Sequence, residues 1–178
     1  MSLLPESGGL HLRPAESGDA AAIRAVHEAA FPTRAEADLV ARLERDGDVA
    51  VSLVATLERE IVGHLLLSRM RVTGDGRPRR ALALGPIGVL PPFQRGGIGS
   101  ALIRGALAIA RATGEELVFV LGEPEYYQRF GFSAETAAPY HSPYAGPYLM
   151  ALAFAGAAPP ASGTAEYARA FGELGASA

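Results

Sequence analysis

The sequence predicts an α/β fold in which a mixed β-sheet, splayed at its centre, has helices on both faces. Apolar stretches with a period of two alternate along the chain with stretches whose apolar residues recur at helical spacing. The stretch Ala81–Leu90 is almost continuously apolar, which is typical of a strand buried on both faces in the middle of a sheet. A glycine-rich loop follows it and leads into an apolar helix, as in sheets whose parallel strands are joined by helical crossovers.

The first half of the chain predicts three strands and two helices. Leu10–Arg13 alternates as a short strand, and Ser17–Asp19 has the polar residues of a helix start. A second helix is expected after Thr33 and ends near Gly47. The β-rich stretch Val49–Leu57 is followed by a tight turn and by a returning strand, Ile61–Val72.

The second half continues the mixed pattern as a single domain. We expect a turn-rich loop, a central strand, a helix, a strand, a short helix, a further strand from Phe132, a loop and a last strand. These segments are Thr73–Arg80, Ala81–Leu90, Ile98–Ala112, Leu117–Leu121, Glu123–Phe130, Pro139–Pro147 and Tyr148–Phe154. Residues 1–155 form the predicted domain, and residues 156–178 form a C-terminal tail that we expect to pack on it.

Composition excludes several classes of function. The 178 residues are 49% hydrophobic, and no apolar run reaches the ~20 residues that cross a bilayer. The start of the chain lacks the pattern of a signal peptide, so the cytoplasm is the expected location and no membrane partner is expected. All sixteen basic residues are arginine and there is no cysteine, which excludes Schiff bases and thiol nucleophiles. The net charge of −3 and the scattered arginines argue against a nucleic-acid partner.

The glycine-rich loop is the most informative motif. Backbone amides at the start of a helix, with no Cβ atoms in the way, attract anions, and the helix dipole adds to this attraction. An adjacent arginine offers a planar fork of donors that suits phosphate. The predicted phosphate-binding residues are Gln94, Arg95, Gly96, Gly97, Ile98, Gly99 and Ser100.

Three kinds of phosphate loop compete for this segment. The nucleoside-triphosphate loop needs a lysine, which the chain lacks. The dinucleotide fingerprint fits Gly97 and Gly99 but meets Leu102 at its third position; Glu123, as a ribose-binding acid, keeps a nicotinamide-dependent oxidoreductase open. The third pattern, Arg/Gln-x-x-Gly-x-Gly/Ala, fits residues 94–99 without exception. On this motif the chain resembles the GNAT superfamily of N-acetyltransferases, whose loop of this form binds the pyrophosphate of acetyl-CoA.

A second motif extends the resemblance. Tyr127–Phe132 is similar to the family's Tyr-x-x-x-Gly-Phe motif and follows the next strand at the expected distance, as in a bacterial branch of predicted N-acetyltransferases. The resemblance implies acetyl-CoA as cosubstrate, direct acetyl transfer to an amine of a small molecule or peptide, and no metal. A homodimer, common in the family, is a further expectation.

The pair Gly85-Pro86 interrupts the central strand. Proline cannot donate to a ladder of hydrogen bonds, so the pair predicts a bulge or a split in the sheet. In the resembled family two parallel strands splay at this point, and the pantetheine arm lies between them. The resemblance thereby assigns pantetheine binding to Ile87, Gly88 and Val89, with the Ile87 amide polarising the thioester carbonyl.

The catalytic groups are less well defined. Without cysteine, direct attack of an amine on the thioester is the simplest mechanism. Tyr127, which matches the motif tyrosine, is the candidate general acid for the departing thiolate. The base stays open between His64, Glu36, the weaker candidates Glu123 and His141, and a chain of water molecules. A non-catalytic CoA-binding sensor or regulatory module is the alternative function.

Overall fold

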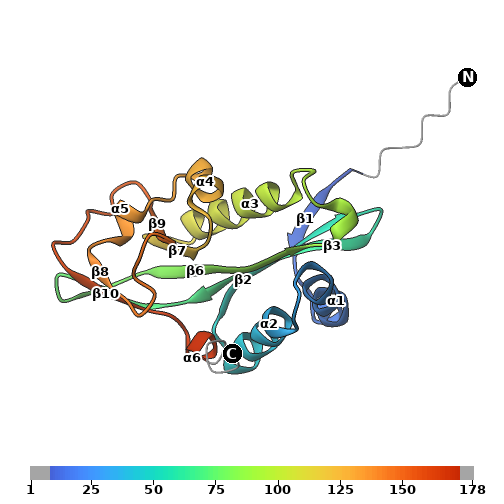
Figure 1. Ribbon diagram of the computed structural model, residues 1–178, viewed down its shortest axis with the longest axis horizontal. Coiled ribbons are helices and arrows are strands. Elements are labelled where there is room, and N and C mark those ends of the chain that lie inside the picture. Colours follow the sequence, from blue (N-terminus) through green and yellow to red (C-terminus); the bar gives the residue numbers. More distant parts are fainter. Residues whose placement is uncertain (1–8, 173–178) are drawn as a thin grey trace, which may run out of the picture.

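The computed structural model describes residues 9–172. Its centre is a six-stranded sheet with the strand order β1-β2-β3-β6-β7-β9, and a four-stranded sheet with the order β5-β4-β10-β8 lies beside it (Figure 1). The strands of the large sheet are β1 (His11–Pro14), β2 (Val49–Leu57), β3 (Glu60–Arg69), β6 (Ala81–Val89), β7 (Leu117–Leu121) and β9 (Leu149–Ala153). Those of the small sheet are β4 (Arg71–Gly74), β5 (Arg77–Arg79), β8 (Tyr140–His141) and β10 (Gly163–Glu166).

Helices cover both faces of the large sheet, as the sequence predicts. Figure 1 shows α1 and α2 on one face and α3 and α4 on the other. Their bounds are α1 (Ala20–Ala30), α2 (Ala35–Asp46), α3 (Ile98–Ala112) and α4 (Pro124–Tyr127), and two short helices, α5 (Ala134–Ala137) and α6 (Arg169–Gly172), follow. In the part of the chain that the structure describes, no helix has the length and apolarity needed to cross a membrane.

Two details of the predicted elements are wrong. The strand expected over Ile61–Val72 breaks at Met70, and its end becomes β4 of the small sheet, while the expected loop Thr73–Arg80 forms the β4–β5 hairpin. The strand expected from Phe132 is replaced by α5. The Oγ of Ser133 accepts a hydrogen bond from the Thr136 amide and caps this helix, so the local capping preference of serine prevails over the apolar pattern.

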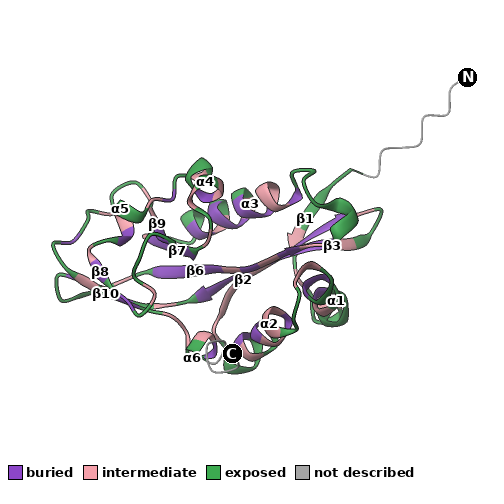
Figure 2. Cartoon of the chain, viewed as in Figure 1, coloured by how far each residue is buried: buried purple, intermediate pink, exposed green. Residues whose placement is uncertain are grey.

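Apolar packing holds α3 tightly against the sheet. Leu102, Ile103 and Ala106 of α3 are fully buried, and they pack against residues of β2, β3, β6 and β7 in one cluster. On the other face, a second cluster joins α1 and α2 to Val54 and Leu66. Figure 2 shows the resulting pattern, in which the central strands are buried and the outer sides of the helices are exposed.

The central strands separate at Gly85, which confirms the predicted splayed sheet. β6 and β7 run parallel and pair only from Ala81↔Leu117 to Leu84↔Val120. Beyond that point the described pairings of β6 are with β3 alone, and a register shift at Leu65 accompanies the change. The edge of β6 from Gly85 to Val89 that faces β7 therefore lacks a partner strand among the described residues.

The segment after β9 returns to the body of the protein. β10 lies between β4 and β8, antiparallel to the first and parallel to the second. Ala165 of β10 is fully buried, and Ala170 of α6 is buried against the cluster under α1 and α2. The described part of the tail, up to residue 172, thus contributes Ala170 to the cluster under α1 and α2, and Ala165 to a further apolar cluster with Phe119 and Tyr140.

Candidate active site

The glycine-rich loop presents free backbone amides at the start of α3. Gly97 is the N-cap residue of this helix and has the left-handed conformation, with a φ of 90°. No side chain accepts a capping hydrogen bond at this position. The Ala101 amide makes the first helical hydrogen bond, 3.0 Å long, to the Gly97 carbonyl. The amides of Ile98, Gly99 and Ser100 therefore lack acceptors within the helix, which is the arrangement that binds anions.

A cavity of about 410 Å³ opens in front of these amides. Two residues to which the sequence assigned no phosphate contact, Tyr126 and Arg129, form one wall. The guanidinium of Arg129 lies 4.8 Å from the centre of the Tyr126 ring and donates a hydrogen bond of 3.2 Å to Ser100 Oγ. The cavity is lined by Val89, Phe93, Gln94, Arg95, Gly97, Gly99, Ser100, Tyr126 and Arg129.

The missed arginine had a signal in the sequence. Arg129 lies inside the tyrosine motif, two residues after Tyr127, so the short helix that carries the motif brings it back toward the start of α3. Gly96 completes the loop without lining the cavity, and Arg95 has a φ of 64°, a conformation that is unusual for arginine. The structure therefore brings five of the seven predicted loop residues to one cavity and adds a second arginine to them, whereas the Ile98 side chain is buried in the core.

Gln94 connects the loop to the unpaired edge of β6. Its Nε2 donates a hydrogen bond of 2.9 Å to the Val89 carbonyl. The Leu90 amide donates to the Val62 carbonyl of the β3 side. Because alternate residues of a strand direct their backbone groups to the same side, Gly88 faces β3 and Ile87 and Val89 face the splay. Ile87 and Val89 thus offer backbone groups where β7 has moved away.

Tyr127 is a buried tyrosine at the end of α4. It is 8% exposed and packs edge-to-face on Tyr126 and Phe132. Gly122 gives room for this ring, because a Cβ atom there would overlap the ring carbons. Burial raises the pKa of the Tyr127 hydroxyl to about 12, and the neighbouring Tyr126 adds to the shift. Tyr127 therefore stays protonated at neutral pH.

His64 lies on the opposite face of the sheet, under α1. It is fully buried, its Nδ1 lies 2.8 Å from Nε2 of His27, and its Nε2 lies 2.9 Å from Oγ of Ser52. Burial lowers the pKa of His64 to about 3 and that of His27 to about 4, so both imidazoles are neutral at pH 7. The sequence singled out His64 but missed His27, which the structure shows on the buried side of α1.

Glu36, the other candidate base, lies in the first turn of α2, the second helix on this face. Its Oε2 is buried and has no hydrogen-bond partner among the described residues. Tyr127 belongs to the cluster under α3, whereas His64 contacts α1. Tyr127, the candidate acid, and the two candidate bases His64 and Glu36 are therefore on different faces of the splayed sheet, whereas the weaker candidate Glu123 caps α4, the helix that carries Tyr127.

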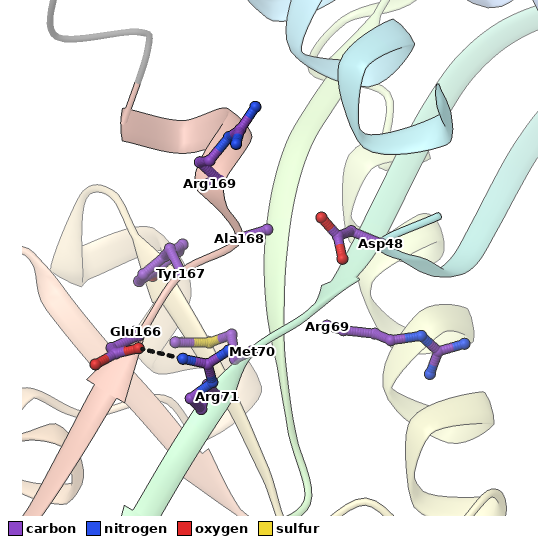
Figure 3. Close-up of a pocket in the computed structure, with 8 residues that line it drawn as sticks. All are labelled: Asp48, Arg69, Met70, Arg71, Glu166, Tyr167, Ala168 and Arg169. Atoms are coloured by element: carbon purple, nitrogen blue, oxygen red, sulfur yellow. Dashed lines mark ion pairs between the residues drawn. The ribbon is translucent and has the colours of Figure 1, made fainter. Parts of the chain in front are cut away.

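A larger cavity, about 480 Å³, lies between the end of α2, the β3–β4 junction and the C-terminal segment (Figure 3). Figure 3 shows that its arginines point apart, and Arg71 forms an ion pair of 3.5 Å with Glu166. Its lining contains none of the loop residues and no residue of β6. We therefore place the site at the smaller cavity, where free amides, arginines and an unpaired strand edge meet.

A metal centre has no candidate within residues 9–172, where no group of three or more histidine, aspartate, glutamate or cysteine side chains is placed to bind an ion. The polar groups that the described part of the site offers are backbone amides, arginines, a tyrosine and imidazoles. These groups suit an anionic ligand and proton transfer.

Comparisons with known proteins agree with this geometry. A family model described as the acetyltransferase (GNAT) domain matches residues 11–134. The uncharacterized N-acetyltransferase YjhQ of Escherichia coli K12 is 40% identical over 119 residues, which cover 66% of each chain. The uncharacterized N-acetyltransferase YhbS of the same strain is 32% identical over 115 residues, covering 64% of this chain and 68% of YhbS.

Solved structures give the same result over more of the chain. A GNAT family acetyltransferase from Brucella melitensis, in complex with acetyl-CoA, is 34% identical with a TM-score of 0.75, and the match covers 92% of this chain and 99% of that one. YhbS from Escherichia coli, in complex with CoA, is 25% identical with a TM-score of 0.85, covering 97% and 96%. The chain therefore belongs to the GNAT family of acetyltransferases.

Proposed function

We propose that this protein transfers the acetyl group of acetyl-CoA directly to an amine of a small molecule or peptide. The observation that carries the proposal is the continuity of the loop with the strand edge: the phosphate-binding amides of α3 and the free edge of β6 are joined by the hydrogen bond from Gln94 to Val89. A ligand with a pyrophosphate at one end and a peptide-like arm matches both features. The acetyl-CoA complex of the Brucella melitensis relative supports the choice of ligand.

In this proposal the loop residues bind the pyrophosphate. The amides of Ile98, Gly99 and Ser100 donate to its oxygens, and the guanidinium groups of Arg95 and Arg129 neutralise its charge. Residues 94–97 hold the turn that leaves these amides uncovered. The cavity in front of α3 is thus the phosphate end of the cosubstrate site.

The arm of the cosubstrate extends along the free edge of β6. Ile87 and Val89 supply backbone hydrogen bonds toward the splay, and the Ile87 amide is the donor for the thioester carbonyl, where negative charge develops during attack. Gly88 contributes a stretch of strand without a side chain. The reaction centre therefore lies where β6 and β7 separate.

The chemistry at this point forms a C–N bond and breaks the C–S bond of the thioester. Tyr127 donates its hydroxyl proton to the departing thiolate sulfur. Burial keeps the Tyr127 hydroxyl protonated, which is the form that can donate a proton. The amine nitrogen loses one proton as the amide forms, and Glu36 and His64 remain the candidates from the sequence for receiving it.

Two measurements test the proposal. Calorimetric titration with CoA is expected to show one site per chain, and thiol release from acetyl-CoA over a panel of amines is expected to identify an acceptor. Lack of CoA binding would overturn the proposed cosubstrate; binding without turnover on any amine would favour the sensor alternative.

The tyrosine has its own test in the variant Tyr127→Phe. Its hydroxyl makes no hydrogen bond to a described residue, so the variant should fold with an unchanged melting temperature. The rate of acetyl transfer should fall by about 100-fold, the usual contribution of a general acid. Full activity in Tyr127→Phe would remove this tyrosine from the mechanism.

A further inference from the structure

The free half of β6 is paired with one strand only. Beyond Leu84 the described pairings of β6 are with β3, where Gly88 lies opposite His64. The height of this half-strand within the sheet therefore depends on the side chains that pack on its two faces. The proposed donor to the thioester carbonyl, the Ile87 amide, belongs to this half, so these contacts decide how accurately the donor is placed.

The imidazole of His27 packs directly on the backbone of the half-strand. A Cβ atom on Gly88 would lie 2.9 Å from Nδ1 and 3.2 Å from Cε1 of His27. Cβ atoms do not approach other heavy atoms to less than 3.0 Å, so an alanine at position 88 would force either the ring or the strand to move. Glycine at this position thus lets a side chain of α1 reach the strand itself.

The ring of His27 is not free to give way. Its Nε2 lies 2.8 Å from Nδ1 of His64, and Nε2 of His64 lies 2.9 Å from Oγ of Ser52. The ring of Phe31 stacks on the imidazole, with 6.0 Å between the ring centres and 10° between the planes. Both imidazoles are 0% exposed. An added group at position 88 would therefore displace the strand and not the ring.

His64 connects this ring to the strand beside β6. His64 and Gly88 lie directly opposite each other on β3 and β6, so their side-chain positions are on the same face of the sheet. The ring of His27 spans both positions, because it lies within hydrogen-bond distance of the His64 ring and covers the backbone of Gly88. One side chain of α1 thereby fixes two neighbouring strands at the point where β7 has separated.

Packing alone does not account for a histidine at this place. Nδ1 of His27 is enclosed and makes no hydrogen bond to a described residue. A buried nitrogen without a partner lowers stability, whereas an apolar ring would fill the same space without that loss. What an apolar ring lacks is the contact through Nε2 with His64, which fixes the orientation of the imidazole against Gly88. Departures of this kind from the most stable packing are typical of functional sites.

We propose that His27 is a positioning residue that fixes Gly88 and, through it, directs the Ile87 amide at the thioester carbonyl. The inference rests on the proposed acetyl transfer and deepens it by naming the side chain that places the donor for the developing negative charge. His27 touches neither the cosubstrate nor the acceptor, since its ring is fully buried. Its role is geometric, and it exchanges no proton with the reactants.

A double-mutant cycle tests the pair. Gly88→Ala should slow single-turnover acetyl transfer by about 100-fold, the effect expected when a donor is displaced by about 1 Å. The dissociation constant of CoA should stay nearly unchanged, because the amides of α3 that bind the pyrophosphate keep their places. In Gly88→Ala/His27→Ala the new methyl group enters the space that the ring leaves, and transfer should be about 10-fold faster than in Gly88→Ala. A double variant no faster than Gly88→Ala would overturn the proposal.

Val26 supplies the matched control for this cycle. Its Cγ1 lies 3.4 Å from the same Cβ position, which is an ordinary van der Waals contact. Val26→Ala therefore adds space beside Gly88 but leaves the close approach of Nδ1 in place. Gly88→Ala/Val26→Ala should stay as slow as Gly88→Ala. Equal recovery in the two double variants would show that only the added space matters and would overturn the specific role of His27.

Two substitutions of His27 decide the question even if Gly88→Ala does not fold. Both His27→Gln and His27→Leu lack the imidazole, but the glutamine amide can keep a hydrogen bond to His64 and the leucine cannot. Transfer should be faster in His27→Gln than in His27→Leu, at the same dissociation constant of CoA. Equal rates in these two variants would contradict a role that depends on the contact between His27 and His64.

The carbonyl of bound acetyl-CoA reports the placement of the Ile87 amide without any acceptor. With carbon-13 at the carbonyl, binding to the wild-type protein should move its NMR signal downfield, since the donor polarises the C=O bond. Gly88→Ala should return the signal toward that of free acetyl-CoA, and Gly88→Ala/His27→Ala should restore the shift. A full wild-type shift in Gly88→Ala would overturn the proposal. Absence of thiol release from the wild-type protein on every amine would instead refute the proposed transfer, and the carbonyl signal would still decide whether His27 places the Ile87 amide.

Discussion

Replacing Arg129 by glutamine should weaken CoA binding without weakening the fold. The guanidinium of Arg129 is exposed, stacks on Tyr126 and donates to Ser100 Oγ, 3.2 Å away, at the start of α3. A hydrogen bond between an ionised donor and a phosphate contributes about 1.5–3 kcal/mol. At 1.4 kcal/mol for each factor of ten, the dissociation constant of CoA should rise by about 10- to 100-fold.

The chain offers a matched control for this charge. The guanidinium of Arg104 also lies over Phe130, at 5.3 Å from the ring centre, but Arg104 does not line the cavity. Arg104→Gln should therefore change the dissociation constant by less than about twofold, since exposed substitutions away from a site have small effects. Calorimetric titration of both variants with CoA, in low salt and in 1 M salt, measures the difference.

High salt adds a further criterion. At 1 M ionic strength the screening length falls to about 3 Å, so the difference between Arg129→Gln and the wild-type protein should shrink. Equal affinity of Arg129→Gln and wild type in low salt would refute the placement of the phosphate beside Arg129. An equal loss in Arg104→Gln would show that the effect comes from the overall charge of this surface.

Two further predictions concern stability. Gly163→Ala places a Cβ atom against the Thr73 carbonyl and the ring of Tyr140 and should lower the free energy of unfolding by about 2 kcal/mol, whereas Gly18→Ala, with open space around it, should be neutral in thermal melts. Acidification should destabilise the wild-type protein more than His27→Phe. The pKa of His27 is about 4 in the folded chain and about 6.5 when unfolded, so the unfolded state takes up protons first as the pH falls from 6.5 to 4. The stabilisation that comes from keeping His27 neutral is complete above pH 6.5, and it is lost as the pH falls through this range, by on the order of 3 kcal/mol. If the melting temperatures of the wild-type protein and of His27→Phe fell in parallel with pH, this account would be contradicted.

Much of the fold follows from local patterns in the sequence. The continuous apolar run of β6, the helix start at Gly97 and the period of α3 are decided by burial and by backbone conformation, which neighbouring residues determine. The same is true of the split at Gly85-Pro86, because a proline removes a donor wherever the strand lies. These local features suffice to predict a glycine-rich loop with free amides at the start of α3.

The features that the sequence did not predict depend on contacts between distant segments. β4 leaves the large sheet at Met70 because its partner is β10, about ninety residues later. His27 reads as an apolar-face residue of α1 until β3 brings His64 to 2.8 Å from it. Arg129 becomes a candidate site residue only because the segment after α4 brings its guanidinium within hydrogen-bond distance of Ser100. The spacing of residues along the sequence does not show which distant segments come into contact.

The position of β10 has a consequence for biosynthesis. β10 is the last strand among residues 9–172, yet it lies inside the small sheet, between β4 and β8. That sheet cannot close until residues 163–166 have left the ribosome, so β4 is synthesised about ninety residues, and β8 about twenty residues, before their common neighbour. The apolar surface under Ala165 stays open during that time, and the synthesis of β10 is the event that allows it to be covered.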